Sequence, residues 1–326
     1  MSPQLDSPQL STPAVTGRAE ASKLLVVGLR CGRLGNRIVL FANLIAFAAE
    51  HGYSLINFSF HSYATFFETT QRDLYCRFPV APRRSLLDRI PGAAGLIRGT
   101  RLFYHLTRAT SVLNQQLQPF GDRVVTLREG GGRLIIPLET PEIAAQIAHA
   151  RVVFLYGWIF RARAAVEKHA EAVRAYFRPV AKYERISSDA VAPLRRQSDV
   201  VVGVHIRQGD YRQWRKGRCF YEIAQYVGWM RDLAAQLPGR RVSFLVCSDE
   251  PRSPQEFPGL SVGFGPGFPM GDLYALAKCD YILGSLSSFS QWSSYYGNKP
   301  LYQLRDGNDR VELTNFRVSY LDDIPR

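Results

Sequence analysis

The sequence predicts an α/β protein built from two successive halves of similar size. Short apolar runs fit for buried strands alternate with longer helical patterns along the chain. The alternation begins near residue 23 and begins again near residue 200. The length of 326 residues also suits two domains, since one domain usually holds about 100–200 residues.

The first half opens with Lys23-Leu-Leu-Val-Val-Gly28, an apolar run that predicts a buried strand. A glycine-rich turn follows at residues 30–36, and a helical pattern then covers residues 38–50. His51-Gly52 ends that helix, and residues 54–58 predict the next strand. Strand, glycine turn, helix and strand in this order indicate the start of an α/β unit.

The first half is expected to end near Pro179. Residues 151–156 predict a strand, which leads through Gly157-Trp158 into one long helical pattern that ends near residue 177. The polar stretch 181–198 is interpreted as a linker. We therefore expect a disordered tail at 1–21, a first α/β domain at 22–180 and a second domain at 196–326.

The second half is predicted to repeat the alternation of strand and helix. Its predicted strands are 200–206, 242–247 and 280–283, and its predicted helices are 220–236, 271–278 and a helix from about residue 287.

The net charge of +13 and the pI of about 9.7 favour an anionic partner: nucleic acid, a membrane surface or a phosphorylated substrate. The five scattered cysteines lack metal-ligand spacing and indicate free thiols of a cytosolic protein. No run reaches the ~18 apolar residues of a membrane span. The first twenty residues lack the features of a signal peptide. We expect a cytoplasmic protein.

Residues 83–108 form a basic, amphipathic stretch with six arginines and one acidic residue, Asp88. One interpretation is a solvated helical face above the core. The alternative is peripheral contact with an anionic membrane surface at the inner membrane face, or with a lipid-linked acceptor.

His205 and Arg207 close the predicted strand 200–206. In open α/β sheets ligands bind beyond the carboxyl ends of strands. Two residues that lie two positions apart on a strand point to the same face, so both side chains can reach one ligand. Arginine presents a planar fork of donors suited to a pyrophosphate. The alternative is an ion pair that braces a turn.

Three further segments carry polar groups at predicted strand ends or turns. Ser287-Ser288 open a predicted helix, either as an anion site made with backbone N–H groups or as a simple N-cap. Asp249-Glu250 follow a strand and either bind ribose or base donors or cap a loop. Gly32-Arg-Leu-Gly-Asn36 lacks the third glycine of a dinucleotide fingerprint and the lysine of a P-loop, but its glycines allow close approach to a ligand.

These pieces, in this order, resemble the superfamily of α1,2-, α1,6- and protein O-fucosyltransferases, and most closely its bacterial α1,2-like branch. His205-Ile-Arg-Gln-Gly-Asp-Tyr211 is similar to the HxRxGDY signature, and Gly32–Asn36 to the opening GRxGN turn. Phe244–Glu250 and Asp272–Trp292 are similar to two later blocks, and Gly157–Phe177 to the segment before the donor domain. The matches span about residues 30 to 300.

The resemblance implies a GT-B fold: two Rossmann-like domains with the active site in the cleft between them. It implies inverting, metal-independent transfer of L-fucose from GDP-fucose to a hydroxyl of a glycan or glycoconjugate, with no cofactor. By matching positions, Arg207 binds the pyrophosphate and assists departure of GDP, and Asn36 lies near the reacting carbon. The implied donor-binding residues are His205, Arg207, Asp249, Asp272, Ser287, Ser288, Phe289 and Gly35.

The sequence departs from the family pattern at Gln208, where a second basic residue is common, and at Glu250, Gln291 and Tyr295-Tyr296. For the base that activates the acceptor, the candidates are Asp210 and Glu68. Two rivals remain: a transferase of the same fold that uses another GDP-sugar, and a non-catalytic anion- or nucleic-acid-binding protein. Nucleic acid is not expected, since the chain lacks helix-turn-helix or zinc spacing and regular aromatic interleaving.

Overall fold

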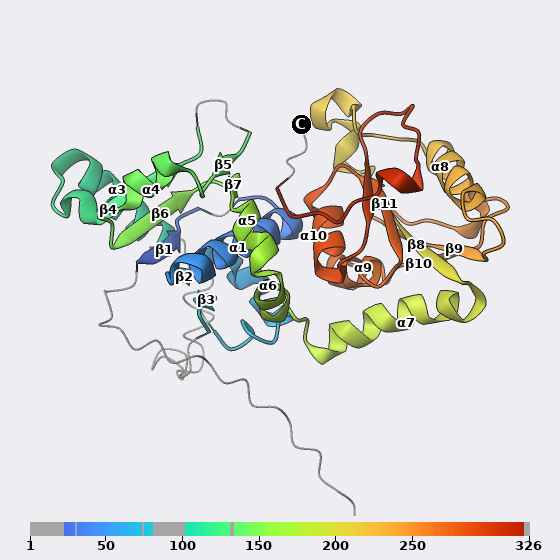
Figure 1. Ribbon diagram of the computed structural model, residues 1–326, viewed down its shortest axis with the longest axis horizontal. Helices are drawn as coiled ribbons and strands as arrows, with labels where there is room; N and C mark the ends of the chain where they lie inside the picture. The colour runs from blue at the N-terminus through green and yellow to red at the C-terminus, as the bar shows by residue number, and fades with distance from the viewer. Residues whose placement is uncertain (1–22, 30, 74, 81–101, 131–133, 323–326) are drawn as a thin grey trace, which may run out of the picture.

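The structure is a computed structural model that describes residues 23–29, 31–73, 75–80, 102–130 and 134–322. The predicted tail at 1–21 and most of the basic stretch 83–108 lie outside the described residues. Figure 1 shows two α/β halves that lie side by side. No described helix has both the length and the apolar character needed to cross a membrane.

The first half is built on a five-stranded sheet with the strand order β3-β2-β1-β6-β4. The strands pair in parallel, except that β3 runs antiparallel to β2. Their bounds are Leu24–Val27 (β1), Ser54–Ile56 (β2), Arg77–Phe78 (β3), Val124–Arg128 (β4) and Val152–Tyr156 (β6). The helices are Leu34–His51 (α1), Leu102–Leu117 (α3), Pro141–Ile147 (α4), Arg163–Lys168 (α5) and Ala170–Tyr176 (α6), and Ile136–Pro137 (β5) pairs with Phe160–Arg161 (β7).

The second half is built on a parallel sheet with the order β10-β9-β8-β11-β12. The chain starts in the central strand and moves first to one side and then to the other, which is the doubly wound Rossmann order. The strands are Val200–Ile206 (β8), Val242–Ser248 (β9), Val262–Phe264 (β10), Tyr281–Ser285 (β11) and Leu301–Leu304 (β12). The helices are Ala181–Gln197 (α7), Ile223–Ala235 (α8), Pro269–Leu276 (α9) and Ser288–Gly297 (α10).

The predicted linker at 181–198 is wrong, because these residues form the helix α7. The segment is polar overall and contains Pro193, so its sequence does not read as a helix. It nevertheless carries a narrow apolar stripe that includes the buried residues Val191 and Leu194. That stripe packs into the core of the second half, and Lys278, which follows α9, pairs with Glu184 of α7. Tertiary packing therefore stabilises a helix that the local sequence disfavours.

The predicted single long helix after Trp158 is also wrong. The chain first forms the short strand β7 and then the helices α5 and α6. His169, between these helices, has the non-helical angles φ −100 and ψ 23. The side-chain Oδ1 of Asn43 on α1 accepts a hydrogen bond from the N–H of Ala162 at 2.8 Å. This buried contact holds the chain against α1 just before α5 begins.

Side chains from α9 and α10 join the core of the first half. Trp292 is fully buried, and its ring lies 4.9 Å from that of Phe177. The hydroxyl of Tyr295 donates to the carbonyl of Val166 at 3.0 Å, and that of Tyr274 donates to the carbonyl of Phe177 at 2.6 Å. The unusual tyrosine at 295 thus belongs to the contact between the halves, which fixes the position of α10 relative to α1.

Candidate functional site in the cleft between the two sheets

A cavity of about 1150 Å³ lies between the two halves. Its walls include residues that follow β8 and β11 of one sheet and β1 and β6 of the other. In each sheet these neighbouring strands flank the point where the strand order reverses, which is where open α/β sheets bind ligands. Ten of the predicted site residues line this cavity: Gly35, Asn36, His205, Arg207, Asp210, Asp249, Asp272, Ser287, Ser288 and Phe289.

Arg207 follows β8, and its guanidinium lies beside the start of α10. Its Nη1 is 3.4 Å from the Oγ of Ser287. Its Nε and Nη2 donate to the two carboxylate oxygens of Asp210 at 2.9 and 2.7 Å. The guanidinium also lies over the ring of Tyr211, 4.6 Å from its centroid. The ion pair between Arg207 and Asp210 therefore stabilises the turn after β8, as the alternative interpretation expected. The Nη1 group of Arg207 also lies at the cavity wall, beside the start of α10.

The start of α10 provides the neighbouring wall. Ser287 is the N-cap of this helix, and its Oγ accepts from the N–H of Phe289 at 3.2 Å. The Oγ of Ser288 donates to the Oδ1 of Asn36 at 2.5 Å, which joins the two halves across the cavity. An added Cβ on Gly35 would lie 2.8 Å from the Ser288 Oγ, so glycine permits this approach. Helix N-terminal N–H groups beside a guanidinium favour an anion.

His205 lines the cavity and is buried. Its Nδ1 is 2.8 Å from the Oγ of Ser290, and its ring stacks on Phe289 with centroids 4.9 Å apart. Burial, with a smaller effect of the Arg207 charge, lowers the pKa of His205 to about 3. The imidazole is therefore neutral at physiological pH, and it acts in this site as a hydrogen-bonding group rather than as a charge.

Asp272, in the first turn of α9, faces the same cavity with only 6% of its surface exposed. Burial raises the pKa of its carboxyl to about 6, although the N–H of Gly267 donates to its Oδ1 at 3.0 Å and opposes this shift. A desolvated carboxylate at a cavity wall suits a ligand that brings N–H or O–H donors, because these replace the lost water.

The raised pKa of Asp272 predicts a pH-dependent gain in stability for Asp272→Asn. The folded-state pKa of Asp272 lies above the ordinary carboxyl value of 3.8. Its favourable contribution to the free energy of unfolding is therefore complete below pH 4 and is lost as the pH rises through 6. The difference between 3.8 and about 6 corresponds to about 3 kcal/mol at neutral pH. Denaturant unfolding should show equal stabilities near pH 4 and a more stable Asn variant at pH 7.5.

His205 titrates in the opposite sense, since its lowered pKa costs stability as the pH falls below its ordinary value. This contribution is common to both proteins and cancels in the difference between them. A stability difference between wild type and Asp272→Asn that does not change with pH would contradict the assigned pKa of Asp272.

The remaining predicted residues organise the turn after β8. The Oδ1 of Asp249 accepts from the N–H of Gln208 at 2.9 Å, so it caps that turn as one interpretation expected. Gln208 is buried, and its Nε2 donates to the carbonyl of Tyr221 at 2.7 Å. Its Oε1 accepts from Arg252, which also pairs with Glu250. The departure at Gln208 therefore lies beneath the turn, and the lining of the cavity does not include this side chain.

Glu68, the second predicted base candidate, is not among the residues that line the cavity. Its carboxylate lies 4.0 Å from the Nη1 of Arg178. Glu129 directly follows β4 and lines the cavity, although no sequence pattern had predicted this acidic residue as part of the site. Val124-Val-Thr-Leu127, which lies just before it in the sequence, has the β-branched and apolar residues that favour a strand. The aromatic side chains Tyr63 and Phe66 of the cavity wall were also missed.

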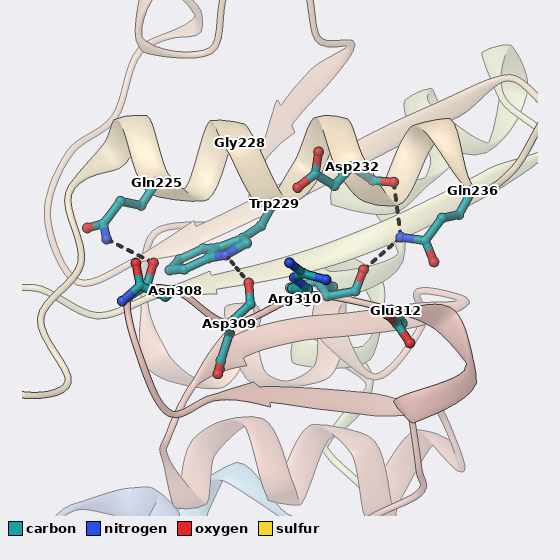
Figure 2. Close-up of a pocket in the computed structure, with 11 residues that line it drawn as sticks. Gln225, Gly228, Trp229, Asp232, Gln236, Asn308, Asp309, Arg310 and Glu312 are labelled. Carbon is teal, nitrogen blue, oxygen red and sulfur yellow. Dashed lines mark hydrogen bonds between the residues drawn. The ribbon is translucent and has the colours of Figure 1, made fainter.

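A second hollow of about 500 Å³ lies elsewhere on the second half, between α8 and the loop after β12 (Figure 2). In this hollow the Nε1 of Trp229 donates to the carbonyl of Asp309 at 2.9 Å, and the Nε2 of Gln236 donates to that of Val311 at 2.7 Å. None of the predicted site residues lines it, and these contacts fasten the loop to α8.

Within the described part of the chain, no group of His, Cys, Asp and Glu side chains is arranged to hold a metal ion.

No family model matches the chain, and no curated protein sequence matches it. The structure is similar to that of a point mutant of FUT1 from Arabidopsis thaliana in complex with GDP, at 13% identity and a TM-score of 0.52, covering 89% of this chain and 72% of that one. POFUT1 in complex with GDP has 11% identity, a TM-score of 0.48 and coverages of 87% and 96%. The fucosyltransferase NodZ from Bradyrhizobium has 16% identity, a TM-score of 0.47 and coverages of 84% and 92%.

The predicted fold class is confirmed: the chain has the GT-B architecture, with two Rossmann-like sheets that face each other across a cleft. Similarity at this level of identity establishes the fold, whereas function has to be argued from the site.

Proposed function

We propose that this protein is a glycosyltransferase that moves L-fucose from GDP-fucose to a hydroxyl of a glycan or glycoconjugate, with inversion and without a metal ion. The observation that carries the proposal is the position of Arg207 Nη1, 3.4 Å from Ser287 Oγ at the start of α10, inside a cleft shared with Asn36 of the other half. The GT-B fold and the GDP complex of the FUT1 mutant support the choice of a GDP-sugar.

The proposed chemistry needs charge stabilisation on the departing GDP. Arg207 and the first N–H groups of α10 supply positive charge at one point of the cleft, so the proposed reaction uses no metal. His205, Asp249 and Asp272 line the same part of the second half and are proposed to hold the nucleoside. Asn36 enters the cleft from the first half and is proposed to lie beside the reacting sugar carbon.

Thermal unfolding with added ligands tests the proposal against its rivals. A ligand that binds only the folded protein raises the unfolding temperature, by an amount that grows with its concentration relative to Kd. We expect GDP to stabilise the protein more than UDP does, and GDP-fucose to release GDP on incubation. Release of GDP from a different GDP-sugar alone would favour the first rival. If only oligonucleotides stabilise the protein, and if high salt removes this stabilisation, the nucleic-acid-binding rival is favoured.

We also propose that α3 contacts an anionic membrane surface, which places the enzyme peripherally at the inner face of the membrane, near a lipid-linked acceptor. Leu106, Leu113 and Leu117 form one exposed ridge, with 57%, 44% and 71% of their surfaces accessible. The helix instead buries polar side chains, among them Ser111, whose Oγ is 2.8 Å from that of Thr126. Residues 89–121 contain no acidic residue, which suits anionic headgroups.

Vesicle sedimentation tests this surface. The protein is expected to bind vesicles that contain phosphatidylserine and to bind phosphatidylcholine vesicles weakly. Leu117→Ser should lower the binding, because one leucine side chain contributes about 2 kcal/mol when it leaves water. Equal binding of Leu117→Ser and wild type to the anionic vesicles would contradict a role for the α3 ridge.

A further inference from the structure

Four acidic side chains line the cleft in the described part of the chain: Glu129, Asp210, Asp249 and Asp272. Both oxygens of Asp210 hold Arg207, and Asp249 caps the turn after β8. Asp272 is buried in the wall of the second half. Glu129 is exposed and differs from these three because it comes from the first half, on the opposite side of the cleft from Arg207.

The backbone around Glu129 holds its carboxylate in place. The N–H of Trp158 donates to its Oε2 at 3.0 Å. Gly157 has a φ of +146, and a Cβ there would lie 2.5 Å from the Cβ of Glu129. Only glycine therefore allows these two segments of backbone to pass so closely. No described residue donates a hydrogen bond to Oε1. One oxygen is thus fixed, and the other is available to a ligand in the cleft.

Arg161 positions the loop that carries Trp158. Its buried guanidinium donates from Nη1 to the carbonyls of Trp158 and Phe160 at 2.7 and 2.9 Å. Burial lowers the pKa of Arg161 to about 10, and the charges of Asp322 and Glu129 oppose this, so the side chain is a cation at neutral pH. This buried positive charge attracts the Glu129 carboxylate.

From this geometry we infer that Glu129 is the general base that takes the proton of the attacking hydroxyl, an inference that rests on the proposed function. The hydroxyl oxygen forms a bond to the anomeric carbon, and its proton passes to a carboxylate oxygen of Glu129. The bond between that carbon and the phosphate oxygen breaks, and GDP leaves with the electron pair beside Arg207. The groups that are proposed to bind the departing GDP lie on the second half, and the base lies on the first half. The two therefore act from opposite sides of the cleft, as an inverting displacement requires.

Hydrolysis of GDP-fucose tests the role of Glu129 without a known acceptor, because water is then the nucleophile. Glu129→Gln keeps an oxygen that can accept from the Trp158 N–H and removes the basicity. We expect GDP release to fall by about 10²–10⁴-fold, the usual contribution of a general base. Sodium azide should restore much of the rate in the variant, because this anion attacks without losing a proton. Glu142→Gln, an exposed change on α4 outside the cleft, is the matched control and should hydrolyse GDP-fucose like wild type.

Three outcomes would overturn the role of Glu129: near wild-type hydrolysis by Glu129→Gln, a slow variant that azide does not accelerate, or loss of stabilisation by GDP in that variant. The last two would indicate a structural role. Failure of the proposed function is recognised separately, because wild-type protein would then neither be stabilised by GDP nor release GDP from GDP-fucose.

Discussion

Arg207→Ala is expected to lower the turnover of GDP-fucose by about 10²–10³-fold, the usual loss when one donor to a developing negative charge is removed. This corresponds to about 3–4 kcal/mol of transition-state stabilisation. The fold should survive, because the Arg207–Asp210 pair is partly exposed and pairs of this kind contribute at most about 1 kcal/mol. The measurement is the rate of GDP release, with circular dichroism to verify the folded state.

Arg212→Ala is the matched control for this prediction. Arg212 lies on the same turn, is exposed, and pairs with Glu250 at 3.6 Å instead of lining the cleft. Its loss should leave turnover within about twofold of wild type, as expected for an exposed pair. A folded Arg207→Ala protein with near-normal turnover would remove Arg207 from the reaction. Arg207→Lys should recover only part of the activity, because lysine lacks the planar fork of donors.

Gly35→Val is expected to lower turnover by about 10²-fold or more, because it separates the two halves at the site. The added Cβ would lie 2.8 Å from Ser288 Oγ and 3.0 Å from the N–H nitrogen of Phe289. To avoid these close contacts, the start of α1 must move away from the start of α10. This movement breaks the 2.5 Å hydrogen bond between Asn36 and Ser288. A displacement of about 1 Å in a reacting geometry commonly costs 10²-fold in rate.

Gly228→Val provides the matched control, because Gly228 is also helical and a Cβ there meets no atom within 4 Å. Its turnover should equal that of wild type. The two variants should be compared by GDP release and by stabilisation with GDP. If Gly35→Val releases GDP from GDP-fucose and is stabilised by GDP as Gly228→Val is, the contact between α1 and α10 has no part in the proposed site.

Much of the second half was predictable from sequence because its central strands β8 and β9 are almost entirely buried. Residues 200–206 form a nearly continuous apolar run, and the structure places β8 there with every residue buried. Two of the site residues were predictable for the same reason, because His205 lies near the end of β8 and Arg207 directly follows it. By contrast, the short strands β5, β7, β10 and β12 carry too few residues for a pattern to emerge.

The first half was harder to predict because its helices depend on contacts with distant parts of the chain. The helix α7 was missed for the same reason: its apolar stripe is narrow, and it packs against α9. Glu129 was missed because nothing near it in the sequence marks it as functional. Its place in the cleft depends on the approach of Gly157, which is 28 residues further along the chain.

By itself the sequence determined the α/β class, the two halves and the residues that the second half contributes to the cavity wall. Each of those follows from local periodicity and from the rule that ligands bind beyond the carboxyl ends of parallel strands. Only the tertiary structure decided which other residues of the first half, such as Glu129, line the same cavity. That choice depends on how Trp292 and Tyr295 of α10 pack into the core of the first half, a long-range contact that no local pattern encodes.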